Sequence, residues 1–344
     1  MDKKDFYNLM CFVPKTEIHV HEEAVLSRST IEKVYAKNSG KTLSNEEYES
    51  LFSYNDFQGF LDSFIKIQSF FSKIEDLNYF FSDFADYLDK NNIIYCETFF
   101  SPTSHLKKGW DFHEMMSIIS KNISTIKKER GKTVKILIDV SRSFGVDNAM
   151  NNLNLILKEN NPDIIGIGLG GNEETGPARD FESVFKKARE KGLHIVVHAG
   201  EICGSSSIKD SLDFLKAERI GHGITSVFDE ELIARLAKEK IPLEICPTSN
   251  IFTKKIVTDI KKHPVRKLYD KGVNVTLNTD DPTFFKVSLI DEYWNLYSQL
   301  DFTLDEIKQI IKNGFNSLFV SSSQKQEFCT LVDEKWNKWF ASRS

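Results

Sequence analysis

The sequence lacks several features that would place it in a specialised class of protein. It has no apolar run near the roughly 18 residues that a membrane-spanning helix requires. Its start, Met1-Asp2-Lys3-Lys4-Asp5, leads into no apolar segment of a signal peptide. Its five cysteines are odd in number, scattered, and never form Cys-x-x-Cys. We therefore expect a reduced, cytoplasmic protein that makes no contact with a membrane.

The chain also lacks a marked excess of charge. Its formal net charge is −5 over 344 residues, so it has no general attraction for nucleic acid or for an anionic surface. It has no low-complexity linker and no phosphate-binding loop, because the glycines of Gly166-x-Gly168-x-Gly170-Gly171 end an apolar run and open no dinucleotide-binding unit. A small-molecule partner is therefore expected, and the sequence does not indicate an oligomeric state.

What the sequence does contain is a regular alternation of short apolar runs and helical segments. The runs cover residues 17–20, 93–100, 134–140, 164–169, 194–197, 219–221, 242–245 and 274–277. Segments between them, such as 181–191 and 228–240, have helical periodicity. This alternation predicts a parallel sheet, and eight units predict an α/β protein of the (β/α)₈ or TIM-barrel type. We expect residues 1–344 to form one domain, with extra helices after the first strand.

Two histidines end the first run, in His19-Val20-His21. In a strand, residues i and i+2 point to the same face, so both rings can converge on one point. Two neutral imidazole nitrogens presented in this way suit a cation such as zinc. The alternative is a buried polar pair, and the choice between them depends on ligands elsewhere in the chain.

Residues with metal-binding and acid–base chemistry follow four later runs. They lie in His198-Ala199-Gly200-Glu201, Gly221-His222-Gly223, Cys246-Pro247-Thr248-Ser249-Asn250 and Asn278-Thr279-Asp280-Asp281-Pro282. Because the C-terminal ends of barrel strands form one face, these segments should meet the histidine pair in a single pocket. Three histidines and an aspartate are a suitable ligand set for one Zn²⁺ per chain.

Together with Pro14-Lys15-Thr16-Glu17-Ile18-His19-Val20-His21, these motifs resemble the adenosine deaminase family over roughly residues 14 to 320. Glu97 with Ser101-Pro102 fits the second strand of that family. The resemblance implies a zinc-dependent (β/α)₈ barrel that hydrolytically removes the 6-amino group from an adenine ring. A cytidine-deaminase type of site would need His-x-Glu with Pro-Cys-x-x-Cys, which the chain lacks.

The resemblance also implies a role for each residue of the site. Its zinc ligands match His19, His21, His198 and Asp280. Its acid, which protonates ring N1, matches Glu201, and His222 matches the residue that orients or deprotonates the attacking water. The residues expected to contact the substrate are Asp281 at N7, the backbone amide of Gly171 at N3, and Glu23, His21, Phe60 and Phe64.

Some of these residues have a purely structural interpretation. Glycines such as Gly171 end strands for conformational reasons alone. Phe60, Leu61 and Phe64 form one apolar face of a helix, which favours ordinary core packing over substrate contact. In the resembled family this region, at about residues 45–90, is a helical lid over the sugar side of the substrate.

The other histidines, together with Cys246 and Ser249 of the motif after the seventh run, are expected to have no chemical role. His194 has the same strand parity as His198, but at about 3.3 Å per residue it lies about 13 Å lower in the barrel. We expect Cys246 and Ser249 to be structural, and His105, His113 and His263 to be surface residues.

Departures from the family pattern leave the substrate open. Glu23 stands where adenosine deaminases usually have an aspartate that binds the ribose 5′-hydroxyl, and its extra methylene would move the carboxylate about 1.5 Å deeper. A glutamate there is typical of relatives that act on free adenine or on aminodeoxyfutalosine. Phe99 replaces a usual arginine, whereas Leu169-Gly170-Gly171-Asn172-Glu173 resembles nucleoside-directed members.

We therefore expect adenosine or a 5′-modified adenosine nucleoside to be the substrate. The alternatives are adenine or aminodeoxyfutalosine deamination, and an inactive relative that only binds purines. A relative without catalysis would be expected to have lost Glu201 or His222, and both are present.

Overall fold

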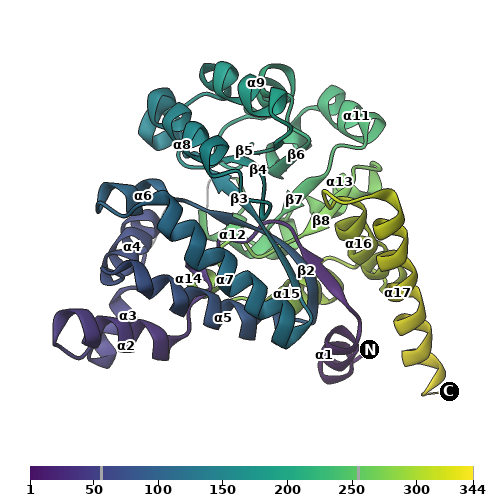
Figure 1. Ribbon diagram of the computed structural model, residues 1–344. Coiled ribbons are helices and arrows are strands. Elements are labelled where there is room, and N and C mark those ends of the chain that lie inside the picture. The colour runs from purple at the N-terminus through teal and green to yellow at the C-terminus, as the bar shows by residue number, and fades with distance from the viewer. Residues whose placement is uncertain (55–56, 254–255, 344) are drawn as a thin grey trace.

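Eight parallel strands form one sheet that curves into a nearly closed barrel (Figure 1). The structure is a computed structural model that describes residues 1–54, 57–253 and 256–343. Each strand pairs in parallel with the next along the chain, from β1 to β8. The strands are β1 Lys15–Glu17, β2 Ile93–Phe100, β3 Thr133–Asp139, β4 Ile164–Leu169, β5 His194–Ala199, β6 Arg219–His222, β7 Leu243–Ile245 and β8 Val275–Leu277. The predicted TIM barrel is confirmed.

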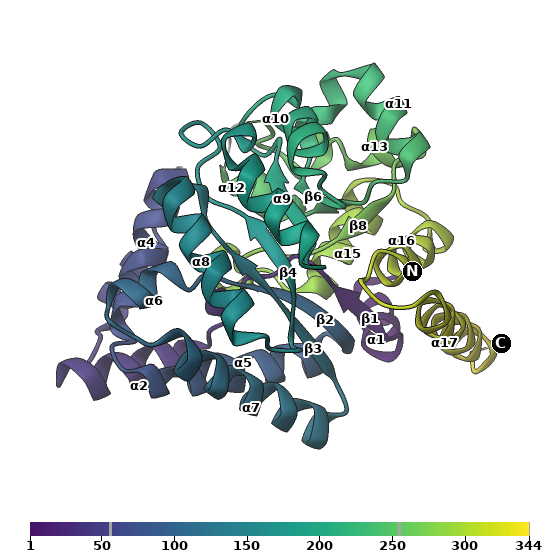
Figure 2. The same ribbon diagram turned by 45° about the horizontal axis from the view of Figure 1, so that its top comes forward.

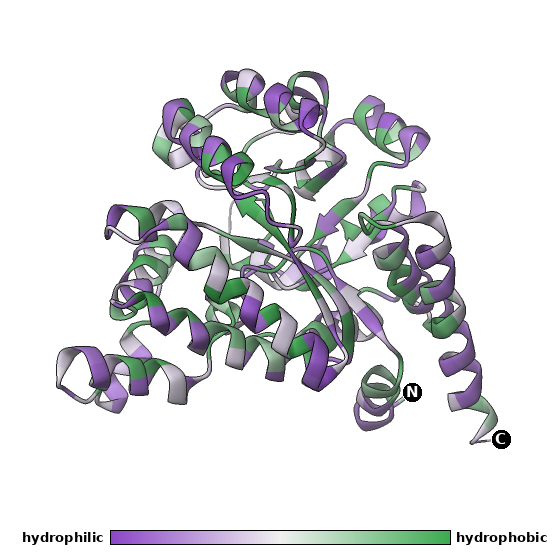
Figure 3. Cartoon of the chain, viewed as in Figure 1, coloured by the Kyte–Doolittle hydropathy of each residue, from purple (hydrophilic) through white to green (hydrophobic). Residues whose placement is uncertain are grey.

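Helices surround this sheet and cover its outer face (Figure 2). They are α1 Lys3–Phe12, α2 Arg28–Ser39, α3 Asn45–Ser50, α4 Phe57–Phe70, α5 Leu77–Lys90, α6 Thr103–Lys107, α7 Phe112–Arg130, α8 Gly145–Glu159, α9 Glu182–Glu190, α10 Ser205–Asp210, α11 Glu230–Glu239, α12 Pro247–Thr253, α13 Val265–Asp270, α14 Pro282–Phe285, α15 Leu289–Gln299, α16 Leu304–Asn316 and α17 Ser322–Ala341. Most carry hydrophobic and hydrophilic residues together (Figure 3). In α7, for example, the buried residues Met115, Ile119, Ile123 and Ile126 recur at helical spacing and face the barrel.

The seam between β1 and β8 is closed differently from the rest of the barrel. The two strands are too short to form a continuous ladder, and in the described structure their backbones meet beyond the strand ends, at the isolated bridge between Val20 and Asp280. There the Asp280 amide donates to the His19 carbonyl at 3.0 Å, and the His21 amide donates to the Asp280 carbonyl at 2.9 Å. The barrel is thus joined at this seam by the backbone of three candidate metal ligands.

Side chains fill the rest of the seam. The Ile18 amide donates to the Asn278 side-chain oxygen at 3.0 Å, and the Thr279 amide donates to a Glu17 carboxylate oxygen at 2.8 Å. The expected first strand, 17–20, is therefore placed too far along the chain. Regular pairing of β1 ends at Glu17, because the Asn278 side chain takes the Ile18 amide, and backbone pairing resumes only as isolated bridges at Val20 and His21.

The long connection after β1 contains the short 3₁₀ helix Glu22–Ala24 followed by α2, α3, α4 and α5. Residues 55 and 56 of the expected lid region lie outside the described residues. Helix α4 is tied to the strand end because the Gln68 amide donates to the Glu23 carbonyl at 2.8 Å. These helices form a layer on one side of the barrel (Figure 1), and α5 packs against the 3₁₀ helix that directly follows His21.

The two ends of the described chain lie on the same side of the barrel (Figures 1 and 2), where Arg343 pairs with Asp5 at 3.0 Å. No helix among the described residues is long and apolar enough to cross a membrane. That residues 1–344 act as one catalytic domain stays a prediction.

Candidate metal centre and active site

Three histidines and an aspartate converge at the C-terminal ends of the strands. The Nε2 atoms of His19 and His21 lie 3.4 Å and 3.3 Å from the same Asp280 oxygen, Oδ1. His198 Nε2 lies 3.4 Å from His21 Nε2. His19, His198, His222 and Asp280 form a buried His/His/His/Asp set whose donor atoms lie within 4.8 Å of one another, and His21, which is partly exposed, shares Asp280 with this set.

The protonation pattern of His19 fits a metal ligand. Its Nδ1 contacts a Glu244 carboxylate oxygen at 2.7 Å, so this nitrogen carries the proton. Its Nε2 is buried and has no hydrogen-bond partner among the described residues, although burial of an unpaired polar atom is unfavourable. A lone pair left free in this way, with the other nitrogen held by a carboxylate, is the usual arrangement of a metal-binding histidine.

His198 also fits a ligand role. Burial lowers its pKa well below the ordinary value, and the neighbouring His19 ring adds to the shift. A neutral imidazole is the form that binds a metal ion. The backbone carbonyl of His198 accepts a hydrogen bond from the buried guanidinium of Arg142 at 2.5 Å, which fixes the end of β5.

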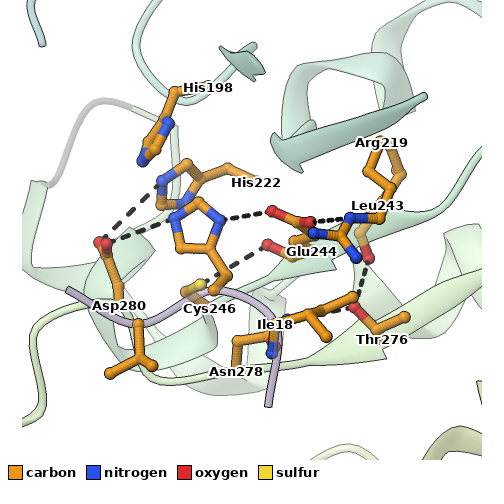
Figure 4. A network of polar contacts seen from close by, with 12 residues as sticks. Ile18, His198, Arg219, His222, Leu243, Glu244, Cys246, Thr276, Asn278 and Asp280 are labelled. Carbon is orange, nitrogen blue, oxygen red and sulfur yellow. Dashed lines mark hydrogen bonds and ion pairs between the residues drawn. The ribbon is translucent and has the colours of Figure 1, made fainter. Parts of the chain in front are cut away.

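His222 belongs to the buried set and lies beside His198 and Asp280 (Figure 4). Its Nε2 is 4.0 Å from Asp280 Oδ2 and 3.6 Å from Glu201 Oε2. Its Nδ1 is held by Asn250 at 3.1 Å. His222 Nε2 thus lies between two carboxylates and farther from Asp280 than His21 Nε2, which is 3.3 Å away, and the division of these histidines between metal ligand and catalytic residue stays a prediction.

The backbone of this centre is strained at two site residues. His222 has φ of 59° and Asp280 has φ of 65°, a left-handed conformation that side chains other than glycine rarely adopt. Such conformations persist at functional sites only when the surroundings hold them in place. Next to them, Gly221 must be a glycine, because a Cβ atom there would lie 2.6 Å from His19 Cε1.

Glu201 is held at the edge of the metal centre by another carboxylate. Glu173 accepts hydrogen bonds from the backbone amides of Gly200 and Glu201, both at 2.9 Å. It also accepts one from the hydroxyl of Ser207 at 2.7 Å. Burial raises the pKa of Glu201 well above its ordinary value, and the Asp280 carboxylate adds to the shift. A carboxyl group that keeps its proton near neutral pH is suited to general acid catalysis.

Asp281 and Gly171 lie at the same end of the barrel. A carboxylate oxygen of Asp281 is within 4.8 Å of His21 and Asp280 donor atoms, and Asp281 is 5% exposed. Gly171 has φ of 91°, and a Cβ atom there would lie 2.6 Å from the Ser143 hydroxyl. The backbone alone therefore requires glycine at this position, and a contact between Gly171 and substrate stays a prediction.

Two adjacent glutamates follow His21 and are buried. Glu23 accepts a hydrogen bond from the Ser101 amide at 2.8 Å through Oε1, whereas its Oε2 has no hydrogen-bond partner in the described part of the chain. Burial raises its pKa to about 7. Neither carboxylate oxygen of Glu22 has a hydrogen-bond partner there, and burial raises its pKa well above the ordinary value.

Aromatic rings form the apolar walls of the centre. Phe99, which stands in place of a usual arginine, lies 5.0–5.2 Å from the rings of His19, His21 and His198. Phe60 of α4 packs against Phe285 at 5.1 Å. Phe64 packs against Phe284 at 5.3 Å. The predicted apolar helix face therefore joins α4 to α14, beside Asp281, and direct substrate contact by Phe60 or Phe64 stays a prediction.

The remaining histidines divide into two groups. His194 lies at the start of β5, where it contacts Glu218 at 2.7 Å and stacks on Phe319, away from the candidate ligands. His113 is exposed. The expectation of surface positions is wrong for His105 and His263, which are 1% and 3% exposed. His105 is buried because its ring stacks between Phe100 and Trp110.

Several functional residues were not predicted from the sequence. Glu244 holds the ring of His19, and Asn250 holds the ring of His222. Ser249 donates to Asp280 Oδ2 at 2.7 Å, so its structural role is to orient a candidate metal ligand. Ser249 and Asn250 had a signal, because both lie in the strand-end motif of residues 246–250. Glu244 had none beyond being a charged residue inside an apolar run.

Comparison with known proteins agrees with this geometry. The family model described as adenosine deaminase matches residues 14–335. The chain is 33% identical to an adenine deaminase of Psychrobacter cryohalolentis, over 94% of this chain and 97% of that one. It is 30% identical to an aminodeoxyfutalosine deaminase of Streptomyces avermitilis, over 98% and 95% of the two chains.

A solved structure shows the same fold. An adenine deaminase from Arthrobacter aurescens superposes with a TM-score of 0.89 at 28% identity, over 95% of this chain and 99% of that one. The family match, the barrel and the buried His/His/His/Asp site agree with one another. The chain therefore belongs to the adenosine deaminase family of aminohydrolases.

Proposed function

We propose that this protein is a zinc-dependent aminohydrolase that converts free adenine and water to hypoxanthine and ammonia. The observation that carries the choice of substrate is the buried Glu23 carboxylate, which uses one oxygen for the Ser101 amide and has no hydrogen-bond partner for the other among the residues that the structure describes. Free adenine has a ring N–H that a nucleoside lacks, because the sugar occupies N9. An unpaired carboxylate oxygen suits that N–H donor.

The relatives named adenine deaminase support this choice over adenosine, which the sequence had favoured. A 5′-hydroxyl would also have to approach a side chain that is longer by one methylene, about 1.5 Å, than aspartate. The aminodeoxyfutalosine deaminase relative makes a nucleoside with an altered 5′ end the second candidate.

His19, His21 and His198, whose rings lie around Asp280, would hold a zinc ion together with Asp280, and the bound ion would supply an activated water as the nucleophile. Glu201 would donate a proton to ring N1, so that C6 accepts the attacking oxygen. Glu173 positions Glu201 by accepting from its backbone amide and from that of Gly200. Burial raises the pKa of Asp281 well above its ordinary value, so its carboxyl group would donate a hydrogen bond to the lone pair of ring N7.

Residues around the pocket would exclude water from the reaction. Helix α4 and the Phe284–Phe285 pair form an apolar contact beside Asp281. Excluding water strengthens each electrostatic interaction in a site of this kind.

The test is a substrate panel of adenine, adenosine and a 5′-modified adenosine, followed by ultraviolet absorbance and ammonia release with zinc-loaded protein. We expect kcat/KM to be highest for adenine. Glu23→Asp should lower adenine turnover at least tenfold and improve the ratio of adenosine to adenine. A matched control is Glu292→Asp, because Glu292 is also buried but contacts Thr248.

No turnover of any of these substrates by zinc-loaded protein would refute deaminase activity. Turnover of adenosine above adenine in the unchanged protein would refute the choice of free base. Unchanged selectivity in Glu23→Asp would remove Glu23 from substrate recognition.

A further inference from the structure

A buried chain of hydrogen bonds runs from the backbone of α13 to His222. The Val265 amide donates to His263 Nδ1 at 3.2 Å. His263 Nε2 contacts the Asn250 side-chain oxygen at 3.2 Å, and the Asn250 side-chain nitrogen contacts His222 Nδ1 at 3.1 Å. His222 and Asn250 are 0% exposed and His263 is 3% exposed, so water does not compete for these contacts.

The direction of this chain is determined at its backbone end. A peptide N–H can only donate, so His263 Nδ1 accepts and carries no proton. A neutral His263 then carries its proton on Nε2, which donates to the Asn250 oxygen. The Asn250 NH₂ group donates in turn to His222 Nδ1. His222 therefore has its proton on Nε2, the nitrogen that faces Glu201 and Asp280.

Reversing the direction of these hydrogen bonds would bring two N–H groups face to face. A proton on His222 Nδ1 would require the Asn250 amide to turn over, which would direct its NH₂ group at the Nε2–H of His263. His263 would then need its proton on Nδ1, against the Val265 amide. At least one buried N–H would lack an acceptor, and such arrangements are strongly disfavoured.

We propose that Asn250 and His263 are positioning residues that keep His222 as the Nε2–H tautomer, so that His222 donates a hydrogen bond to the reacting oxygen and takes no proton from it. This assignment chooses between the two roles, orienting or deprotonating the attacking water, that the family resemblance left open. Its catalytic part rests on the proposed function, whereas the tautomer itself does not.

The neighbouring residue Ser249 supports this interpretation. Ser249 and Asn250 are consecutive in α12, and their side chains hold Asp280 and His222 respectively. One turn of helix thus positions both a candidate metal ligand and the residue beside it. His222 Nε2 has no hydrogen-bond partner among the residues described, so its N–H is available to an oxygen bound between Glu201 and Asp280.

The tautomer can be measured without turnover. Long-range ¹H–¹⁵N correlation spectra of protein labelled at histidine distinguish protonated from unprotonated ring nitrogens, and His222→Gln identifies the signals of His222. We expect Nδ1 of His222 to be unprotonated at neutral pH, in the metal-free protein and in the zinc-loaded protein. A proton on Nδ1 in both forms would overturn the proposal.

Paired variants test the hydrogen bonds that link His263, Asn250 and His222. Because a glutamine nitrogen can replace the Nε2–H of histidine, His263→Gln should keep the wild-type tautomer and turnover, whereas His263→Leu should lose the donor and lower kcat about tenfold. Asn250→Asp, which can only accept when ionised, should move the His222 proton to Nδ1. We expect kcat to fall by about 10² to 10⁴, since a wrong histidine tautomer costs about 10⁴ in a serine protease.

Zinc content, KM and the thermal midpoint are measured in parallel, and all three should change little in the His263 variants. If kcat falls equally in His263→Gln and His263→Leu while the tautomer is unchanged, His263 has only a structural role and the proposal fails. If the spectra show the expected tautomers but no purine is deaminated, the proposed function fails and the tautomer assignment stands.

Discussion

Replacing Glu244 with glutamine should weaken metal binding, although the two side chains have nearly the same shape. Glu244 Oε2 accepts from His19 Nδ1 at 2.7 Å, and Oε1 pairs with Arg219 Nε at 2.7 Å (Figure 4). Glutamine has one acceptor and one donor, so it can satisfy only one of these N–H groups. If its oxygen faces Arg219, its NH₂ group forces the His19 proton onto Nε2, the nitrogen that should bind the metal.

The expected loss of metal affinity can be estimated from the hydrogen bond between Glu244 and His19. A hydrogen bond to a charged group contributes about 1.5–3 kcal/mol. Removing the hydrogen-bond partner of a metal-binding histidine typically lowers metal affinity about 10- to 100-fold, or about 1.4–2.8 kcal/mol. Arg219 keeps its pairing with Glu97 at 2.5 Å, so it retains one of its two carboxylate partners. We therefore expect a loss of about 2 kcal/mol in metal binding without loss of the fold.

The assay is competition for zinc between the protein and a chromophoric chelator at pH 7.5. Glu292→Gln is a matched control, because Glu292 is fully buried but bonds Thr248 and Asn295 and no metal ligand in the described structure. We expect the control to bind zinc as the wild type does. Equal affinity in Glu244→Gln and the wild type, with His19→Ala losing the metal, would refute the reasoning.

Two further predictions concern catalysis and acid stability. Glu201→Gln should keep zinc binding but lower kcat by at least 10²-fold, because an amide cannot supply the proton to N1. His105→Phe should reduce the loss of stability in acid, because burial lowers the pKa of His105 to about 3 and Lys108 adds to the shift. The unfolded chain takes up this proton near pH 6.5, so stability falls as pH drops from about 6.5 toward 3, by on the order of 4 kcal/mol.

The Glu201→Gln and His105→Phe predictions are tested by different measurements. Turnover of adenine is compared with zinc content for Glu201→Gln, and activity close to the wild type would exclude Glu201 as the acid. Urea midpoints at pH 7, 5 and 4 are compared for His105→Phe and the wild type. A phenylalanine keeps the stack with Phe100 and Trp110, and equal pH dependence in the two proteins would show that His105 does not contribute.

The sequence predicted the strands and most of the site because their signals are local. Runs such as 93–100 are continuous β-forming segments, and each histidine or carboxylate of the site directly follows such a run. The burial of His263 was not predictable in this way, because its partner Asn250 comes from another element and the contact exists only after folding. The same applies to Glu244, which lies 225 residues from His19 in the chain.

Substrate choice was hardest to predict because it depends on a few atoms. Glu23 was identified as a departure from the family pattern, but its effect depends on which of its oxygens is already bonded. The contact of Oε1 with the Ser101 amide appears only in the folded chain, where Oε2 has no hydrogen-bond partner in the part that the structure describes. The end of β1 was misplaced for a related reason, since Glu17 and Asn278 side chains replace backbone pairing at the seam.

The seam between β1 and β8 also constrains the order of events during synthesis. His19 and His21 leave the ribosome early, whereas Asp280 is added 261 residues after His19. At a synthesis rate of about 5–20 residues per second, roughly 13 to 50 s pass between the addition of His19 and the addition of Asp280. A nascent chain can therefore offer at most part of the donor set. Because Asp280 also joins the two strand ends through its backbone, complete metal loading becomes possible only when the ring of strands is finished.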